Sequence, residues 1–310
     1  MSKVLAVFGA TGQQGSSTVN YVLNDPELSQ KYKIRAITRD VDSEKAKQLK
    51  EKVEVVRGDP LNRTSLSTAL TGAHTVFIMT VNYFSPDGPD MQYNSGKTIA
   101  DVAVEKGASY IIFSTLPPIK EISGGKYTSS PFDVKAEIEK YIRGLPIKSS
   151  FLSAGSFMEN FQSQAILALQ PAPDGTWVMA RHFSPKSKWP LIDVVGDTGK
   201  FVGAILADPD KYEGKTLCAA TAIYTLEEII ATISKTAGKT VVFKHISLDD
   251  FKKTLPPEIA DTATEFFNYV EEFGYYGPDT EKLVAWAAAN ARGRLHTFEE
   301  YLEAHPVRLE

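Results

Sequence analysis

A glycine-rich segment near the N-terminus constrains the fold more than any other part of the chain. Gly9, Gly12 and Gly15 are spaced three residues apart, after the apolar run Lys3–Phe8 and before an amphipathic stretch that ends near Leu23. A strand that ends in such glycines and turns into a helix is typical of a βαβ unit that holds the pyrophosphate of a dinucleotide. The alternative is an ordinary glycine turn. We also assign the residues Thr11, Gln13 and Gln14, which lie between these glycines, to the predicted dinucleotide site.

Short apolar runs alternate with amphipathic stretches through the first half of the chain. The expected strands are Lys3–Phe8, Lys33–Thr38, Val53–Val56, Thr75–Met79, Tyr110–Ser114 and Ile147–Leu152. The expected helices are Gly12–Leu23, Ser43–Lys50, Arg63–Leu70, Gln92–Gly107 and Asp133–Arg143. Because strands that alternate with helices form a parallel sheet covered on both faces, we expect an α/β fold, a Rossmann-like doubly wound parallel sheet.

The alternation breaks after about Gly155. The following elements are short strands at Trp177–Ala180 and Leu191–Val194, a helix at Val195–Ala207 and a returning strand at Thr216–Ala219. We expect a dinucleotide-binding domain over residues 1–154 and a smaller, mostly helical substrate or partner domain over residues 155–310. The chain should return to the sheet around residues 191–220, and a cleft should lie between the two parts.

Two later helices carry a start signal that is visible in the sequence. Thr225 precedes Glu228 by three residues, and Thr297 precedes Glu300 by the same spacing. Each pair predicts a capping box, in which the two side chains satisfy backbone N–H groups of the first helical turn.

The end of the second expected strand bears on the choice of cofactor. It reads Ala36-Ile37-Thr38-Arg39-Asp40. An acidic residue here would bind the ribose 2′-hydroxyl of NAD, whereas the guanidinium fork of Arg39 suits a 2′-phosphate. We therefore expect NADP(H), with NAD as a weaker ligand. Asp40 could bind the hydroxyl instead if Arg39 points away, and Arg39 could be a solvated surface charge.

Composition excludes several classes of protein. The 310-residue chain has a net charge of −4 and no long basic run, so nucleic acid is not expected as a direct partner. It has no apolar stretch long enough for a membrane span and no room for a signal peptide before the first strand. The single cysteine, Cys218, fits a reducing compartment. We expect a cytoplasmic protein, with a nuclear location as the alternative.

These motifs together resemble the NmrA-like family of atypical short-chain dehydrogenase/reductase proteins. The resemblance covers nearly the whole chain and rests on Gly9–Gly15, Thr38–Arg39, Arg57–Asp59, Phe77–Thr80, Phe132–Glu139, Phe157–Asn160 and Phe273–Asp279. The last segment resembles one common in the fungal regulator branch of the family. The family comprises redox-sensing regulators that bind NADP or NAD and some quinone reductases, and it implies a Rossmann domain with a small C-terminal domain.

The resemblance also implies positions for further site residues. Asp59 should lie beside the adenine, although it could instead be a turn residue before Pro60. Phe157 should border the nicotinamide, although it could be ordinary core. The remaining implied residues line the cofactor after the fourth strand or the nicotinamide pocket: Thr80, Val81, Asn82, Gly155 and Ser156.

The catalytic pair of typical short-chain reductases is incomplete in this sequence. Those enzymes use a Tyr four residues before a Lys on the helix after the fifth strand. Lys135 is present on the matching helix, but Pro131 stands in the position of the Tyr, and Tyr127 has the wrong spacing. We expect Lys135 to contact the nicotinamide ribose and to assist any reduction. The alternative is a solvated lysine paired with Glu139.

Two hypotheses follow. The missing Tyr favours an NADP(H)-responsive regulator whose state is read by a protein partner such as a transcription factor. The other hypothesis is an NADPH-dependent reductase of a quinone or small carbonyl compound that works without the Tyr. No metal-ligand spacing appears in the sequence.

Overall fold

Alternate residues of the first strand are buried on opposite faces of a sheet. In β1 (Lys3–Phe8), Leu5 and Val7 pack in one apolar cluster, whereas Ala6 and Phe8 pack in another. Successive side chains of a strand point to opposite faces, and burial of both sets requires a covering layer on each side. The apolar run that precedes the glycines is therefore a central strand.

The computed structural model describes residues 2–83, 85–163, 167 and 169–309. Within these residues, seven strands form one parallel sheet in the order β11-β6-β5-β4-β1-β2-β3. The further strands are β2 (Tyr32–Thr38), β3 (Glu54–Arg57), β4 (Thr75–Ile78), β5 (Tyr110–Thr115), β6 (Lys148–Ala154) and β11 (Thr216–Ala219). The predicted Rossmann-like, doubly wound sheet is confirmed.

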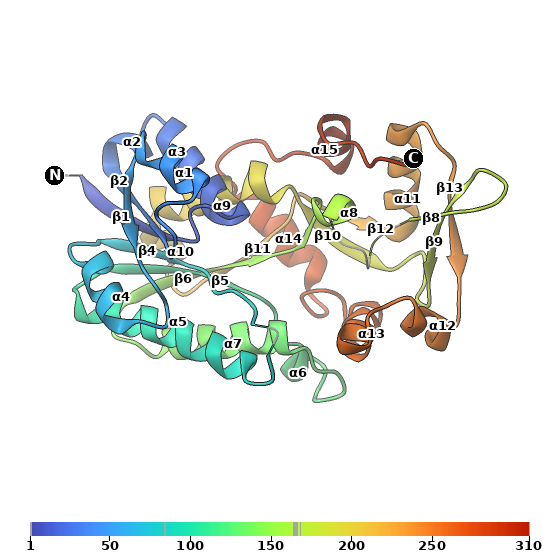
Figure 1. Cartoon of the computed structure of the whole chain (residues 1–310), viewed down its shortest axis with the longest axis horizontal. Coiled ribbons are helices and arrows are strands. Elements are labelled where there is room, and N and C mark those ends of the chain that lie inside the picture. The colour runs from blue at the N-terminus through green and yellow to red at the C-terminus, as the bar shows by residue number, and fades with distance from the viewer. Residues whose placement is uncertain (1, 84, 164–166, 168, 310) are drawn as a thin grey trace.

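Helices cover both faces of this sheet (Figure 1). The helices of the first half are α1 (Gln13–Asn24), α2 (Leu28–Lys31), α3 (Glu44–Lys50), α4 (Arg63–Leu70), α5 (Gly88–Glu105), α6 (Ile119–Ile122) and α7 (Ser130–Arg143). The helices α5 and α7 begin before the expected Gln92 and Asp133. The reason is that Pro89 and Pro131 occupy the first turn, where a missing N–H group costs nothing.

One strand and one helix from the second half of the chain complete the sheet and the helical layer that covers it. Strand β11 pairs with β6 at its edge, and α9 (Val194–Ala207) packs along α1. The two helices approach closely because α9 presents two glycines to α1: a side chain at Gly203 would collide with the ring of Tyr21, and one at Gly199 would collide with the Cβ of Tyr21 and the backbone of Ser17. The N–H group of Gly199 also donates to the hydroxyl of Ser17 at 2.9 Å. The helix that follows the glycine loop is thus supported by a distant part of the chain.

The rest of the second half combines helices with two small sheets. Their orders are β12-β10-β7 and β13-β9-β8. The strands are β7 (Ser156–Phe157), β8 (Gln170–Pro171), β9 (Trp177–Arg181), β10 (Lys188–Ile192), β12 (Ala222–Thr225) and β13 (Val241–His245). The helices are α8 (Asn160–Ser163), α10 (Pro209–Tyr212), α11 (Leu226–Ala237), α12 (Leu248–Lys253), α13 (Pro257–Phe273), α14 (Thr280–Ala289) and α15 (Phe298–Ala304).

The helix starts in this half follow the sequence. Both capping boxes are confirmed, because Thr225 and Thr297 each accept the N–H group of the glutamate three residues later, whose side chain returns the bond. The strands β7, β8, β12 and β13 were not expected, since each is short and its residues are mostly half-buried or exposed. In the part of the chain that the structure describes, no helix is long and apolar enough to cross a membrane.

Candidate functional site

The glycine loop has the geometry of a phosphate-binding turn. Gly9 has a φ of +59°, in the left-handed region that favours glycine, and a Cβ atom there would lie 2.6 Å from the sulfur of Met79. The N–H group of Gly12 donates to the carbonyl oxygen of Gly9 at 2.8 Å and closes the turn. A Cβ atom on Gly15 would overlap that same carbonyl group, so α1 can pack this closely only with glycine.

The N-terminal end of α1 is open to an anion. Its N-cap is the exposed Gly12, which has no side chain to cap the helix, and its first turn carries no acidic residue. The first N–H groups of a helix lack partners within the helix and carry partial positive charge. A loop of this kind leading into a helix is suited to bind a pyrophosphate.

A cavity of about 590 Å³ lies at the carboxyl ends of the first four strands. It brings together several residues that the sequence analysis singled out: Gly9, Thr11, Gly12, Arg39, Thr80 and Val81. It also includes Ser43 and Lys45 of the α3 region, which the sequence analysis missed. The sequence indicated these two residues only by their position, a few residues after Arg39 at the end of β2.

Other predicted residues lie beside this cavity rather than among its lining residues. Gln13 is exposed at the start of α1, and the side-chain oxygen of Gln14 accepts the hydroxyl of Ser114 at 2.8 Å. Asp59 accepts the N–H group of Leu61 at 3.0 Å, which is the geometry of a turn residue. Its two neighbours, Gly58 and Pro60, do line the cavity.

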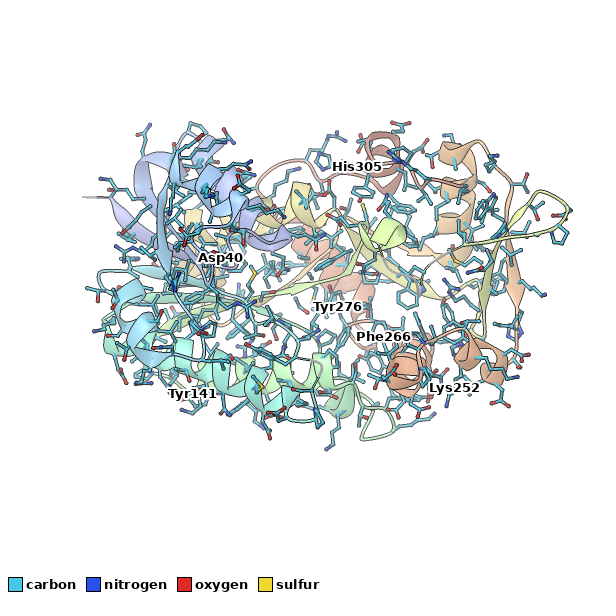
Figure 2. All side chains as sticks on the ribbon, in the orientation of Figure 1. Asp40, Tyr141, Lys252, Phe266, Tyr276 and His305 are labelled. Carbon is cyan, nitrogen blue, oxygen red and sulfur yellow. The ribbon has the colours of Figure 1, made fainter. Side chains whose placement is uncertain are left out.

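Arg39 and Asp40 are both exposed and both line the cavity. The carboxylate of Asp40, labelled in Figure 2, accepts the N–H group of Asp42 at 2.9 Å and so helps to form the turn before α3. Arg39 provides a guanidinium at the same edge. The arrangement favours a phosphate over a hydroxyl group at this position.

Lys135 is buried between the ends of two strands. Its ammonium group donates to the carbonyl oxygen and hydroxyl of Thr80, at 3.3 and 3.2 Å, and to the carbonyl oxygen of Ser114 at 3.3 Å. Burial lowers the pKa of Lys135 to about 8. The alternative of a solvated pair with Glu139 is wrong, because Glu139 binds Arg143 at 2.6 Å instead.

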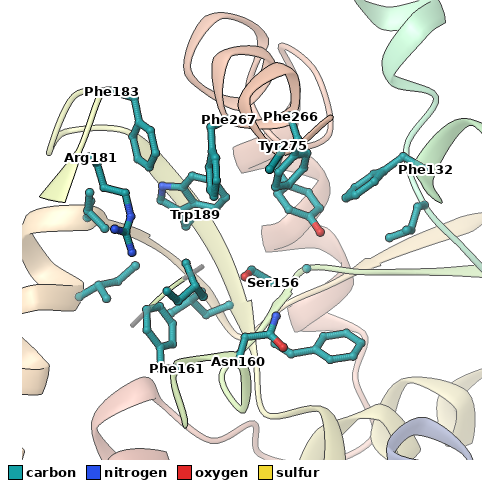
Figure 3. Close-up of a pocket in the computed structure, with 18 of the residues that line it drawn as sticks. Phe132, Ser156, Asn160, Phe161, Arg181, Phe183, Trp189, Phe266, Phe267 and Tyr275 are labelled. Atoms are coloured by element: carbon teal, nitrogen blue, oxygen red, sulfur yellow. The ribbon is translucent and has the colours of Figure 1, made fainter. Parts of the chain in front are cut away.

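A second cavity, of about 340 Å³, lies between the sheet and the C-terminal elements. Aromatic side chains form much of its wall, as the close-up in Figure 3 shows. The sequence analysis missed these aromatic residues, which come from distant segments: Phe132, Phe161, Phe183, Trp189, Phe266, Phe267 and Tyr275. Only Phe132 and Tyr275 lay in segments that the resemblance had marked.

The two cavities adjoin at the segment that follows β4. Thr80 and Val81 line the larger cavity, whereas the next residue, Asn82, lines the aromatic one. The remaining predicted residues, Gly155, Ser156 and Phe157, also line the aromatic cavity. The expected site residues are therefore distributed over two neighbouring spaces.

A doubly wound parallel sheet whose first strand runs into a glycine loop defines the Rossmann class of dinucleotide-binding folds. The family model of the NmrA-like family matches residues 1–302, and the chain belongs to this family. An NmrA-like family domain-containing protein of Dictyostelium discoideum is 30% identical, with 100% of both chains covered. The NmrA-like family domain-containing oxidoreductase lnaB of Aspergillus flavus is 26% identical, over 90% of this chain and 87% of that one.

Solved structures show the same fold. NmrA, a negative transcriptional regulator, superposes with a TM-score of 0.80 at 24% identity, over 98% of this chain and 95% of that one. It has been solved in complex with NADP and with NAD. The triphenylmethane reductase of Citrobacter sp., complexed with NADP(H), has a TM-score of 0.76 at 20% identity, over 97% and 99% of the chains. The NADPH-dependent quinone oxidoreductase QOR2 of Escherichia coli, complexed with NADPH, has a TM-score of 0.74 at 22% identity, over 97% of this chain and 99% of that one.

Proposed function

We propose that this protein is an NADPH-dependent oxidoreductase that reduces a substrate held in the aromatic cavity. The observation that carries the proposal is the junction of the two cavities at Thr80–Asn82. A dinucleotide bound along the glycine loop would reach this junction with its nicotinamide end, beside an apolar space that can hold a substrate. The relatives named as oxidoreductases and the two reductases of the same fold support this reaction class.

The residues of the larger cavity fit NADP(H). The glycine loop and the open N-terminus of α1 would bind the pyrophosphate, and Arg39 would bind the 2′-phosphate, with Lys45 as a second cation nearby. Asp59 and its neighbours would border the adenine. NAD is a weaker ligand in this proposal, because only the 2′-phosphate uses Arg39.

Reduced nicotinamide supplies a hydride when it is bound. The chain contributes orientation and a dry environment, since the aromatic walls exclude water from the neighbouring space. Lys135 fixes the Thr80 segment against β5 and lies where it can approach the ribose. Gly155, Ser156 and Phe157 would border the nicotinamide at the sheet edge of the aromatic cavity.

The deciding experiment measures the oxidation of NADPH by the purified full chain with a panel of quinones, aromatic carbonyl compounds and a triphenylmethane dye. We expect turnover with at least one aromatic acceptor and slower turnover with NADH. The matched control is Trp189→Leu, which opens the aromatic wall and leaves the glycine loop unchanged. Absence of turnover with every acceptor, in a protein that binds NADPH, would refute the reductase proposal.

A second candidate is a cofactor-responsive regulator. Two observations favour it: Pro131 replaces the usual catalytic Tyr, and the fold matches that of the regulator NmrA along nearly all of both chains. A redox sensor must bind the oxidised and reduced cofactor with different affinity, because only differential binding shifts a conformational equilibrium. Calorimetry with NADP and NADPH tests this requirement, and equal affinities would exclude redox sensing.

A further inference from the structure

Arg181 is a buried cation whose hydrogen bonds are incomplete. It is the last residue of β9, its exposed fraction is only 4%, and its side chain lines the aromatic cavity. One terminal nitrogen, Nη1, donates to the carbonyl oxygen of Ala180 at 2.7 Å. The other two nitrogens, Nε and Nη2, have no hydrogen-bond partner within the part of the chain that the structure describes.

The protein does not compensate this charge with an acidic side chain. Among the described residues, no carboxylate forms an ion pair with Arg181. Burial lowers the pKa of Arg181 to about 10, so the guanidinium is still charged at neutral pH. The ring of Phe251 lies 5.9 Å away and offers a cation–π contact, but it supplies no acceptor in the plane of the guanidinium.

Such an arrangement is costly for a residue that only fills space. Buried polar groups are nearly always paired, and a buried unpaired charge destabilises a fold unless something else binds it. An apolar side chain could pack against Phe251 without this cost. The unsatisfied donors therefore point to a ligand that supplies the missing acceptors.

The two free nitrogens define the shape of that acceptor. Nε and Nη2 form one edge of the planar guanidinium, which is the edge that donates two parallel bonds to a carboxylate. Both nitrogens are buried, and in Figure 3 the guanidinium lies next to the space between Trp189 and Phe161, so a carboxylate bound there would draw the side chain slightly toward the cavity. A bound carboxylate would thus have its remaining carbon skeleton among aromatic rings.

The aromatic walls define the rest of the ligand. Phe183 and Phe267 are stacked with centroids 5.0 Å apart, and Trp189 meets Phe267 with its centroid at 5.6 Å. Flat rings pack well in such a space, and a cavity of about 340 Å³ is at the small end for ligand pockets, so one or two fused rings fill it. Asn82 and Ser156 also line the cavity, and Asn82 lies at the junction with the cofactor cavity.

The geometry points to small aromatic carboxylates as the ligand class of this cavity, with the carboxylate bound to Nε and Nη2 of Arg181. The inference rests on the proposed function for its chemistry: a carbonyl or quinone group on the same ring system, directed toward Asn82 and Ser156, is the group reduced. That group takes up a hydride from NADPH and a proton from water, and NADPH becomes NADP.

The test is an equilibrium binding measurement that requires no turnover. The full chain, saturated with NADP, is titrated with 2-naphthoate and with its neutral isostere 2-naphthamide, and binding is followed by calorimetry and by the intrinsic tryptophan fluorescence, to which Trp189 in the cavity wall contributes. We expect the wild type to bind the acid at least about tenfold more tightly than the amide, as befits a charge-assisted bond pair. Arg181→Met should remove this preference, with a much larger loss of affinity for the acid than for the amide.

Two further variants keep the test decisive. Arg294→Met removes an exposed arginine that pairs with Glu300; neither residue lines the cavity, so this variant should bind both probes like the wild type. Arg181→Lys keeps a positive charge but loses the fork, and it should retain only part of the preference, which covers the case in which Arg181→Met does not fold. Equal binding of acid and amide by the wild type, or unchanged binding of the acid by a folded Arg181→Met, would overturn the inference.

The outcome separates this inference from the reductase proposal. Oxidation of NADPH by neutral quinones without any preference for 2-naphthoate refutes the carboxylate class and leaves the reductase standing. Arg181-dependent binding of 2-naphthoate without oxidation of NADPH by any acceptor supports the ligand class and refutes the reductase.

Discussion

The ammonium group of Lys135 lies 3.2 Å from the hydroxyl oxygen of Thr80, and it also binds the carbonyl oxygens of Thr80 and Ser114. Thr80 follows β4 and lines the cofactor cavity, whereas Ser114 lies on β5. A single side chain from α7 thus joins the ends of two neighbouring strands beneath the proposed nicotinamide position. Its burial and its contacts lead to two predictions.

The first prediction concerns the pH dependence of stability. Burial lowers the pKa of Lys135 from its ordinary value of 10.5 to about 8 in the folded protein. Between these values the unfolded chain holds a proton that the folded chain has released, so the free energy of unfolding should rise with pH in this window. Relative to Lys135→Met, the wild type should gain at most on the order of 3 kcal/mol. Denaturant titrations at several pH values measure this difference.

The control for that measurement is Lys140→Met, which changes an exposed lysine on the same helix. It should follow the wild type across the whole pH range. If the profiles of the wild type and Lys135→Met run parallel, Lys135 does not have the lowered pKa.

The second prediction concerns cofactor binding by Lys135. Lys135→Ala should weaken binding of NADPH, because the Thr80 segment loses its anchor and the ribose loses a nearby donor. Glu139 lies one turn away on α7, where its carboxylate pairs with Arg143 and accepts the hydroxyl of Thr216 at 3.1 Å; neither contact involves the cofactor cavity, so Glu139→Ala should bind NADPH like the wild type. Calorimetry decides, and full affinity in Lys135→Ala would remove Lys135 from the site.

The third prediction is that two glycines of the loop have different roles, Gly12 in cofactor binding and Gly15 in stability. Gly12 is exposed and has a φ of −91° and a ψ of 178°, which any residue adopts, so Gly12→Val should fold normally and lose dinucleotide binding. A side chain at Gly15 would overlap the backbone of Gly9, so Gly15→Val should lose stability by roughly 1–3 kcal/mol or more. Thermal melting and NADPH titration of both variants test the contrast, and unchanged NADPH affinity in Gly12→Val would end the phosphate-loop interpretation.

The fourth prediction concerns cofactor selectivity. Arg39→Ala should remove most of the preference for NADP(H) over NAD(H), about tenfold to a hundredfold, and leave NAD(H) affinity nearly unchanged. Lys50→Ala is a suitable control, because Lys50 is exposed on the adjacent helix and is not among the residues that line the cofactor cavity. If the wild type bound NADP(H) and NAD(H) equally, Asp40 would replace Arg39 as the residue assigned to bind the ribose.

The fifth prediction compares two adjacent tyrosines. Tyr275 lines the aromatic cavity, and among the described residues its hydroxyl makes a single, long hydrogen bond of 3.4 Å, to the carbonyl oxygen of Ala154. Burial raises the pKa of Tyr275, so it can donate a hydrogen bond to a substrate oxygen but releases its proton with difficulty. Tyr275→Phe should therefore lower kcat by about tenfold, with little change in KM.

Tyr276→Phe is the matched control for that variant. The hydroxyl of Tyr276 donates to the carbonyl oxygen of Ser153 at 2.8 Å, and this residue is not among those that line the aromatic cavity. Figure 2 shows Tyr276 near the middle of the molecule. Its replacement should cost about 1 kcal/mol of stability and leave kcat unchanged. Equal kcat values for the two variants would mean that Tyr275 does not act on the substrate.

Local patterns could predict much of this molecule. The glycine loop was accessible from the sequence because its strand, turn and helix are consecutive, and the helix starts at Thr225 and Thr297 depend on residues three positions apart. The aromatic cavity was not accessible, because Phe132 and Phe266 meet only after the tertiary fold forms, with centroids 4.7 Å apart. In the sequence, Arg181 looks like any arginine at the end of a strand.

The contribution of α9 and β11 to the nucleotide half has a consequence for synthesis on the ribosome. The first six strands of the sheet in chain order end at Ala154, but the edge partner of β6 and the helix that covers α1 come from residues 194–219. Until those residues have emerged, the nascent chain exposes the apolar face that includes Val19 and Val22, together with an unpaired strand edge. The N-terminal half therefore completes its folding only after Ala219 has left the exit tunnel, and the two halves cannot be exchanged as independent modules between proteins.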